Sequence, residues 1–274
     1  MKAKELISGE VYMVGPNDSI AHVRNMFMKH KTTRLLVYDG KPIGVITQKD
    51  LSDAYSAERT NTDALHVSDV MTRKVLSVDA DDPVVRVVKM MQLGHVSGLA
   101  VQEKGEVIGE VTKKDLVRYF AENHKGEVQV KDLMTKDVKT ITESHSVFHA
   151  AKIMKKHGVG RLVVMNDNKI EGIISEGDIS MFQGKAKPTM VTFIRKTLTG
   201  LSKRSAKSYP TTVGELMHEN VISVREDADA AQAARMMLDK KVGSILVVEN
   251  NAPKGIISKS DIVNHLASCV KEGL

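Results

Sequence analysis

Four short segments of this chain share one spacing of glycine, hydroxyl and carboxylate residues. In each, a glycine is followed three residues later by Thr or Ser and six residues later by Asp. The glycines are Gly44, Gly109, Gly172 and Gly255, the hydroxyl residues are Thr47, Thr112, Ser175 and Ser258, and the aspartates are Asp50, Asp115, Asp178 and Asp261. Apolar residues precede each motif and an amphipathic run follows it, which predicts a strand, a turn and a helix.

This placement has two chemical interpretations. A Thr or Ser at a helix start can cap the helix, and an Asp three residues later is stabilised by the helix dipole. The same atoms suit a ligand, because free N–H groups and a hydroxyl form an anion site and a carboxylate can accept both hydroxyls of a ribose. We expect capping at all four copies, and ligand binding is a separate hypothesis.

Other residues that could do chemistry form no catalytic pattern. Six histidines lie on or beside predicted helices without the close pairing that a zinc site requires; they are His22, His30, His95, His145, His149 and His157. No serine lies in a nucleophile elbow, and no phosphate-loop lysine pattern occurs. We therefore expect no catalytic residue, no metal and no enzymatic activity.

The elements that position the motifs repeat along the chain. Each motif glycine follows a two-residue landmark by 37 or 38 residues, counted from the landmark's first residue. The four landmarks are Ile7-Ser8, Met71-Thr72, Met134-Thr135 and Met217-His218. Between landmark and motif lie a short β-like run, an amphipathic helix and a second strand, which begins at Arg34, Gly98, Arg161 or Ser244. The predicted unit is β-α-β-β-α.

Taken together, these features resemble the cystathionine β-synthase (CBS) domain. The resemblance covers residues 1–55, 67–120, 130–182 and 213–266, called repeats 1 to 4 here. It implies a mixed α/β (α+β) fold in which CBS domains pair into two Bateman modules, repeat 1 with repeat 2 and repeat 3 with repeat 4. Four copies in one chain are similar to the γ regulatory subunit of AMP-activated protein kinase and to archaeal stand-alone proteins. The modules would form a disc, within one chain or between two.

The resemblance also implies roles for the motif residues. The ligands of the family are AMP, ADP, ATP and S-adenosylmethionine. Asp50, Asp115, Asp178 and Asp261 fall on its ribose-binding aspartate, and Thr47, Thr112, Ser175 and Ser258 fall on its ribose- or phosphate-contacting hydroxyl. Arg34 and Arg161 match a phosphate-binding position at which repeats 2 and 4 carry Gly98 and Ser244. The acidic Glu176 in the third motif is expected to weaken polyphosphate binding there.

Composition limits the remaining function classes. Aromatic residues make up 4% of the chain and Trp is absent, so aromatic stacking on bases is not expected. The single cysteine, Cys269, excludes an internal disulfide, and we expect it to be a buried thiol on a C-terminal helix. No apolar run approaches membrane-spanning length and the N-terminus lacks a signal-peptide pattern, so we expect a cytoplasmic protein without membrane contact.

One inserted segment carries the positive charge of the chain. Residues 183–212 hold no acid and seven basic residues, whereas the whole chain has a formal net charge of +6. The basic residues are Lys185, Lys187, Arg195, Lys196, Lys203, Arg204 and Lys207. Pro188 could start a helix in this linker, with Met190, Val191, Ile194, Leu198 and Leu201 as its apolar stripe. The linker is either a docked interdomain helix or a patch for anions or RNA.

Two functions follow from these patterns. The first is a regulatory, energy-sensing protein that binds an adenosyl ligand and acts on a separate protein effector, since the repeats leave no stretch for a catalytic domain. The alternative is an RNA- or ribosome-associated factor that binds through the basic linker and is tuned by nucleotide.

Overall fold

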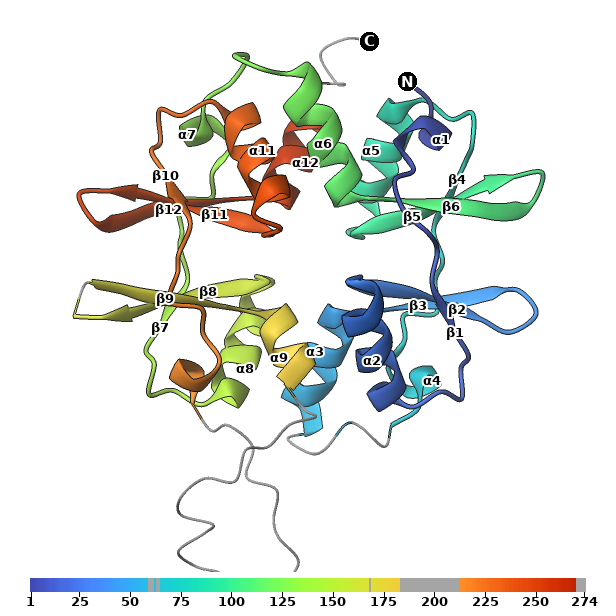
Figure 1. The fold of residues 1–274 in the computed structure, drawn as a ribbon, viewed down its shortest axis with the longest axis horizontal. Helices are drawn as coiled ribbons and strands as arrows, with labels where there is room; N and C mark the ends of the chain where they lie inside the picture. Colours follow the sequence, from blue (N-terminus) through green and yellow to red (C-terminus); the bar gives the residue numbers. More distant parts are fainter. Residues whose placement is uncertain (59–61, 63–64, 168, 183–211, 270–274) are drawn as a thin grey trace, which may run out of the picture. The chain divides into compact units, whose positions relative to one another are not determined.

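The structure is a computed structural model that describes residues 1–58, 62, 65–167, 169–182 and 212–269 of the 274-residue chain (Figure 1). The basic linker and its seven predicted anion-binding residues, Lys185, Lys187, Arg195, Lys196, Lys203, Arg204 and Lys207, lie outside the described residues, as does the helix predicted after Pro188.

Each repeat forms the predicted order of elements. Repeat 1 contains β1 (Met13–Val14), α2 (Ile20–His30), β2 (Arg34–Tyr38), β3 (Pro42–Thr47) and α3 (Gln48–Glu58). Repeat 2 contains β4 (Ser77–Asp79), α5 (Val84–Leu93), β5 (Gly98–Glu103), β6 (Glu106–Thr112) and α6 (Lys113–Asn123). Repeat 3 contains β7 (Thr140–Ile141), α8 (Val147–His157), β8 (Arg161–Asn166), β9 (Lys169–Ser175) and α9 (Glu176–Phe182). Repeat 4 contains β10 (Ser223–Val224), α11 (Ala230–Asp239), β11 (Ser244–Glu249), β12 (Ala252–Ser258) and α12 (Lys259–Cys269).

All four sheets have the same three-stranded topology. The first strand is parallel to the second, and the second is antiparallel to the third, as in β1-β2-β3. The second strand is central and nearly continuous in buried residues; Leu35, Leu36 and Val37 of β2 are examples. The helix before it begins at a polar cap in three repeats, because Ser19, Ser146 and Asp229 accept backbone N–H bonds from the first turn.

The landmarks lie at the ends of short helices that the sequence did not reveal. These helices are α1 (Ala3–Leu6), α4 (Val67–Val70), α7 (Val130–Leu133) and the 3-10 helix η2 (Val213–Glu215). Each landmark packs on the motif of a neighbouring repeat and not on its own. Met71 packs on Gly44 and Met217 on Gly172, while Ile7 packs on Gly109 and Met134 on Gly255. The exchange links repeat 1 with repeat 2 and repeat 3 with repeat 4, the pairs for which Bateman modules are expected.

The chain divides into two compact units whose helices pack internally. Unit 1 comprises residues 1–12, 73–138 and 220–274, and unit 2 comprises residues 13–72 and 139–219. In unit 1, α6 packs on α11 and α12, and α5 packs on α12, around a core that includes Val117, Phe120 and Met237. In unit 2, α3 packs on α8 and α9. Packing of repeat 2 on repeat 4, and of repeat 1 on repeat 3, was not predicted.

A buried arginine also holds unit 2 together. Arg24 of α2 is 4% exposed, and its Nε donates to the Ser180 carbonyl oxygen at 2.7 Å while Nη2 donates to the Thr62 hydroxyl at 2.7 Å. The Ser180 bond lies in the last turn of α9, where a cation is favoured by the helix dipole. Arg24 therefore fixes the C-terminal end of a motif helix.

Cys269 corrects one expectation. It ends the described part of α12 and is exposed. The buried side of this helix ends at Leu266 and Ala267, so the thiol has no core to enter.

The motif glycine is required by the exchanged landmark, and Gly44→Ala tests this. An ideal Cβ at Gly44 would lie 2.8 Å from the Thr72 carbonyl oxygen and 2.9 Å from Met71 Sδ. The Thr72 backbone is fixed, since it exchanges two 2.9 Å hydrogen bonds with Val45. We expect Gly44→Ala to lower the free energy of unfolding by about 1–3 kcal/mol in urea denaturation.

Gly9→Ala is the control, because an ideal Cβ at Gly9 meets no atom within 4 Å. Equal unfolding midpoints for the two variants would show that the glycine is not selected by landmark packing.

Candidate ligand-binding site

The four motif turns share one hydrogen-bond arrangement. In each, one carboxylate oxygen (Oδ2) of the Asp accepts both the backbone N–H and the hydroxyl of the Thr or Ser three residues earlier. The N–H and O–H bonds are 2.8 and 2.6 Å at Thr47, 2.8 and 2.6 Å at Thr112, 2.8 and 2.7 Å at Ser175, and 2.7 and 2.5 Å at Ser258. The predicted hydroxyl and aspartate therefore meet at the start of α3, α6, α9 and α12, where the aspartate caps the N–H of the motif Thr or Ser in all four repeats. The expected reverse cap, from the aspartate N–H to the hydroxyl, is present at Thr47 at 3.3 Å and at Ser175 at 3.4 Å.

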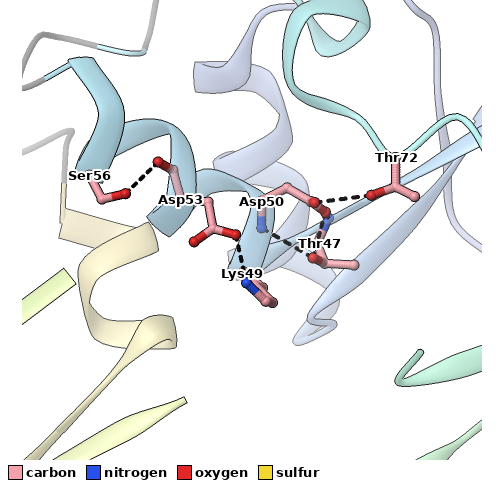
Figure 2. Close-up of polar contacts among 6 residues, drawn as sticks. All are labelled: Thr47, Lys49, Asp50, Asp53, Ser56 and Thr72. Carbon is pink, nitrogen blue, oxygen red and sulfur yellow. Dashed lines mark hydrogen bonds and ion pairs between the residues drawn. The ribbon is translucent and has the colours of Figure 1, made fainter. Parts of the chain in front are cut away.

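The second carboxylate oxygen of each aspartate receives a donor from the exchanged landmark. Figure 2 shows this for repeat 1, where the Thr72 hydroxyl donates to Asp50 Oδ1 at 3.2 Å. The corresponding donors are Ser8 to Asp115, Thr135 to Asp261 at 3.2 Å and His218 Nε2 to Asp178 at 2.9 Å. These four donors were missed as site residues. The available signal was a hydroxyl or imidazole at the second landmark position of every repeat.

Two arginines lie beside the motif hydroxyls. In the antiparallel hairpins, Arg34 is the register partner of Thr47, and Arg161 is the partner of Ser175. Directly opposed residues of an antiparallel pair lie about 5 Å apart on one face of the sheet. A guanidinium there suits a phosphate. In repeats 2 and 4 the same register positions hold Gly98 and Ser244, which carry no charge.

The motif helices of each unit begin next to each other. In unit 1, Lys113 Nζ at the start of α6 donates to the Ser260 hydroxyl of α12 at 2.8 Å. In unit 2, an ideal Cβ at Gly177 of α9 would lie 3.1 Å from Gln48 Oε1 of α3. Each unit therefore brings together two helix N-termini, each with a carboxylate and a hydroxyl, and such ends favour anions.

The motif aspartates differ in their surroundings. Asp115 is 4% exposed and also receives Arg118 Nη1 at 3.3 Å. In unit 2, burial raises the pKa of the Asp50 carboxyl, and the hydrogen bonds from Thr47 and Thr72 oppose that shift. Lys49 pairs with Asp53 one turn along α3, with Nζ and Oδ2 2.6 Å apart (Figure 2). The positive charge of Lys49 is thus partly neutralised by Asp53 within unit 2.

Glu176 is an additional half-buried acid in unit 2. It is the first residue of α9, its N–H donates to the Gly160 carbonyl oxygen at 3.0 Å, and its Oε2 lies 3.3 Å from the position of an ideal Gly160 Cβ. Burial raises the pKa of the Glu176 carboxyl; Lys49 and Arg161 lower it, and Asp53 and Asp50 raise it further.

This shift predicts a pH-dependent effect of Glu176→Gln on stability. A carboxyl whose pKa is higher in the folded than in the unfolded state stabilises the fold below its unfolded pKa, about 4.3, and loses that contribution as pH rises through the folded pKa. Because Gln stays neutral, the variant should unfold at higher urea concentration than wild type at neutral pH. Its advantage should shrink towards pH 4.

Glu171→Gln removes the same charge from an ion pair with the exposed Lys169 and is the control. A pH-independent difference between Glu176→Gln and wild type would contradict the assigned cause.

Among the described residues, no group of three or more His, Cys, Asp or Glu side chains could hold a metal ion. The rings of His145 and His149 stack with their centroids 5.0 Å apart. In the same described part of the chain, none of the helices is long and apolar enough to cross a membrane.

Comparison with known families identifies the repeats. The model of the CBS domain matches residues 3–57, 67–122, 130–184 and 213–268. These matches cover most of the sequence, so the chain belongs to the CBS domain family.

The most similar relatives include archaeal proteins. MJ1404 of Methanocaldococcus jannaschii is 26% identical over 277 residues, which cover 98% of this chain and 62% of that protein. A 33.4 kDa protein in a ribosomal RNA operon of Thermofilum pendens is 23% identical over 183 residues, which cover 66% of this chain and 57% of that protein. The chain thus spans about three fifths of the length of these two relatives.

A third relative has a solved structure with the same fold. MJ1225 of Methanocaldococcus jannaschii is 23% identical over 278 residues, which cover 94% of this chain and 96% of that protein. Its crystal structure, described as that of a candidate archaeal homologue of g-AMPK, superposes with a TM-score of 0.80 and 20% identity over 97% of this chain and 100% of that chain.

Proposed function

We propose that this protein is a regulatory sensor that binds adenosyl ligands (AMP, ADP, ATP or S-adenosylmethionine) at its motif turns and acts on a separate partner. The carrying observation is that all four repeats fix a carboxylate and a hydroxyl at a helix N-terminus. Membership of the CBS domain family supports a regulatory and non-catalytic role. Asp50, Asp115, Asp178 and Asp261 would receive the ribose hydroxyls, and Arg34 and Arg161 would face phosphate.

The landmark donors supply a regulatory mechanism. A ribose hydroxyl that reaches the Asp50 carboxylate competes with the Thr72 hydroxyl for the same oxygen. Ligand binding would therefore change how the landmark of repeat 2 is held on repeat 1. A ligand shifts an equilibrium between two such arrangements only by its difference in affinity for them, and a partner that prefers one arrangement would read that shift.

Hydrogen–deuterium exchange with and without AMP tests where the ligand binds. We expect slower exchange in peptides that contain the first turns of α3, α6, α9 and α12, because a ligand bound there would shield their backbone N–H groups from water. The N–H groups of the first helix residues already donate to backbone carbonyl oxygens, so the slowing should come from the residues that follow them. Slower exchange confined to other segments, or none at saturating AMP, would contradict the proposal.

One observation favours a second function. The linker at 183–212 holds seven basic residues and no acid, which suits a nucleic-acid backbone. Association with RNA or a ribosome is therefore the alternative, with the motif turns tuning it.

A linker variant separates the two functions. It replaces Lys185, Lys187, Arg195, Lys196, Lys203, Arg204 and Lys207 with Gln. If the protein is chiefly a sensor, the variant should keep its nucleotide affinity within about threefold, since few basic side chains meet one nucleotide. If RNA is the partner, wild type should bind RNA with a steep salt dependence that the variant loses. Gel shifts across a salt series distinguish these results, and wild type that binds no RNA at low salt would exclude the alternative.

A further inference from the structure

The two units differ in the charges around their motif helices. Each repeat has four positions near its motif turn: the first residue of the second strand, the first two residues of the motif helix, and the residue three after the motif Asp. At these positions unit 1 carries four basic residues and no acid. They are Lys113, Lys114, Arg118 and Lys259. At the same positions unit 2 carries three basic residues, Arg34, Lys49 and Arg161, and two acids, Asp53 and Glu176.

Glu176 is the acid that structure places closest to the helix start. The first helix residue donates its N–H to the residue before the second strand in every repeat: Gln48 to Thr33, Lys113 to Ser97, Glu176 to Gly160 and Lys259 to Gly243. Only repeat 3 has an acid at this position. Its carboxylate lies over Gly160, the residue that precedes Arg161.

We propose that Glu176 is an internal competing anion that makes unit 2 favour adenosyl ligands of low negative charge. This inference rests on the proposed adenosyl-binding function. The charges of Lys49 and Arg161 lower the pKa of the Glu176 carboxyl against the effect of burial, and these are the cations that a phosphate at the third motif would use. Asp53 adds to the effect, since it pairs with Lys49 at 2.6 Å.

Like charges a few ångströms apart in a partly buried site repel strongly, so each further phosphate on the ligand costs more in unit 2. A ligand that carries ribose but no phosphate meets the aspartate and hydroxyl alone. Glu176 should therefore lower the binding affinity of such a ligand only slightly.

The test compares ATP with 5′-methylthioadenosine, which has no phosphate. Calorimetric titrations use the full chain carrying Asp115→Asn and Asp261→Asn, so that only the motifs of unit 2 keep their aspartates. In this background we expect Glu176→Gln to strengthen ATP binding on the order of tenfold and to leave 5′-methylthioadenosine binding within about twofold. Gln is the natural residue of repeat 1 at this position, Gln48, so the fold should accept it.

Glu171→Gln is the matched control, because it removes the same charge from an ion pair with the exposed Lys169. If the background variants unfold, the same comparison is made with Glu176→Gln in the otherwise unchanged chain. There, the ATP sites of lower affinity should bind ATP more tightly. The inference would be overturned, with the proposed function left standing, by any of three results. These are equal gains in affinity for both ligands, an equal gain in ATP affinity in Glu171→Gln, or no gain in ATP affinity in Glu176→Gln. Failure of both ligands to bind wild type would overturn the proposed function and, with it, this inference.

Discussion

Replacing Asp115 with alanine is expected to lower the free energy of unfolding by about 2–4 kcal/mol, the largest effect among the motif aspartates. The carboxylate is 4% exposed, and it accepts from the backbone and hydroxyl of Thr112, from Ser8 and from Arg118. Its loss would leave those donors without their acceptor and would detach the landmark of repeat 1 from α6. Urea denaturation measures the effect.

Asp261→Ala is the matched comparison in the same unit. Asp261 makes the equivalent bonds to Ser258 and Thr135 but lies in a more accessible position, so water can replace it. We expect a loss of about 1–2 kcal/mol there. If Asp261→Ala costs as much as Asp115→Ala, burial does not decide the strength of the cap.

Replacing Asp50 with asparagine is expected to weaken adenosyl binding at repeat 1 by on the order of 1–3 kcal/mol. Asn keeps the size of the side chain and one acceptor for the Thr47 N–H, so most of the cap should remain. It removes the charge and one of the two oxygens that would accept ribose hydroxyls. Calorimetry of the variant, with its folding checked by circular dichroism, measures the difference.

Ser68→Ala is a suitable control, because it alters α4 in the same unit at a position outside the motif. A variant in which Asp50→Asn destabilises the fold but leaves every affinity unchanged would show that Asp50 serves as a cap alone.

Much of the fold could be predicted because its signals are local and repeated. The glycine, hydroxyl and aspartate spacing marks a strand, a turn and a helix, and the strands starting at Arg34, Gly98, Arg161 and Ser244 begin where expected. The short landmark helices were missed because four residues or fewer show no periodicity.

The exchange of landmarks and the packing of repeat 2 on repeat 4 depend on contacts between distant residues. Ile7 on Gly109 and Lys113 on Ser260 are examples. No local pattern in one sequence encodes such pairs. The landmark contacts explain why the motif needs glycine, because a Cβ there would clash with the landmark. The sequence by itself predicts the glycine only as part of a turn.

The candidate site was half predictable for the same reason. The aspartate and hydroxyl of each motif are neighbours in sequence and meet at a helix start, as expected. The donors Ser8, Thr72, Thr135 and His218 come from another repeat, so their role appeared only in the structure. From the sequence, Glu176 is expected to weaken polyphosphate binding at the third motif, and this effect stays a prediction. The structure adds the position of its carboxylate, with Oε2 3.3 Å from an ideal Cβ at Gly160.

Calorimetric titration of the wild-type chain with AMP, ADP, ATP and S-adenosylmethionine tests the central claim most directly. The account predicts saturable binding of at least one of these ligands, lost stepwise as Asp50, Asp115, Asp178 and Asp261 are replaced by Asn. Absence of binding for all four at millimolar concentration would contradict it, and the four aspartates would then be helix caps without a ligand.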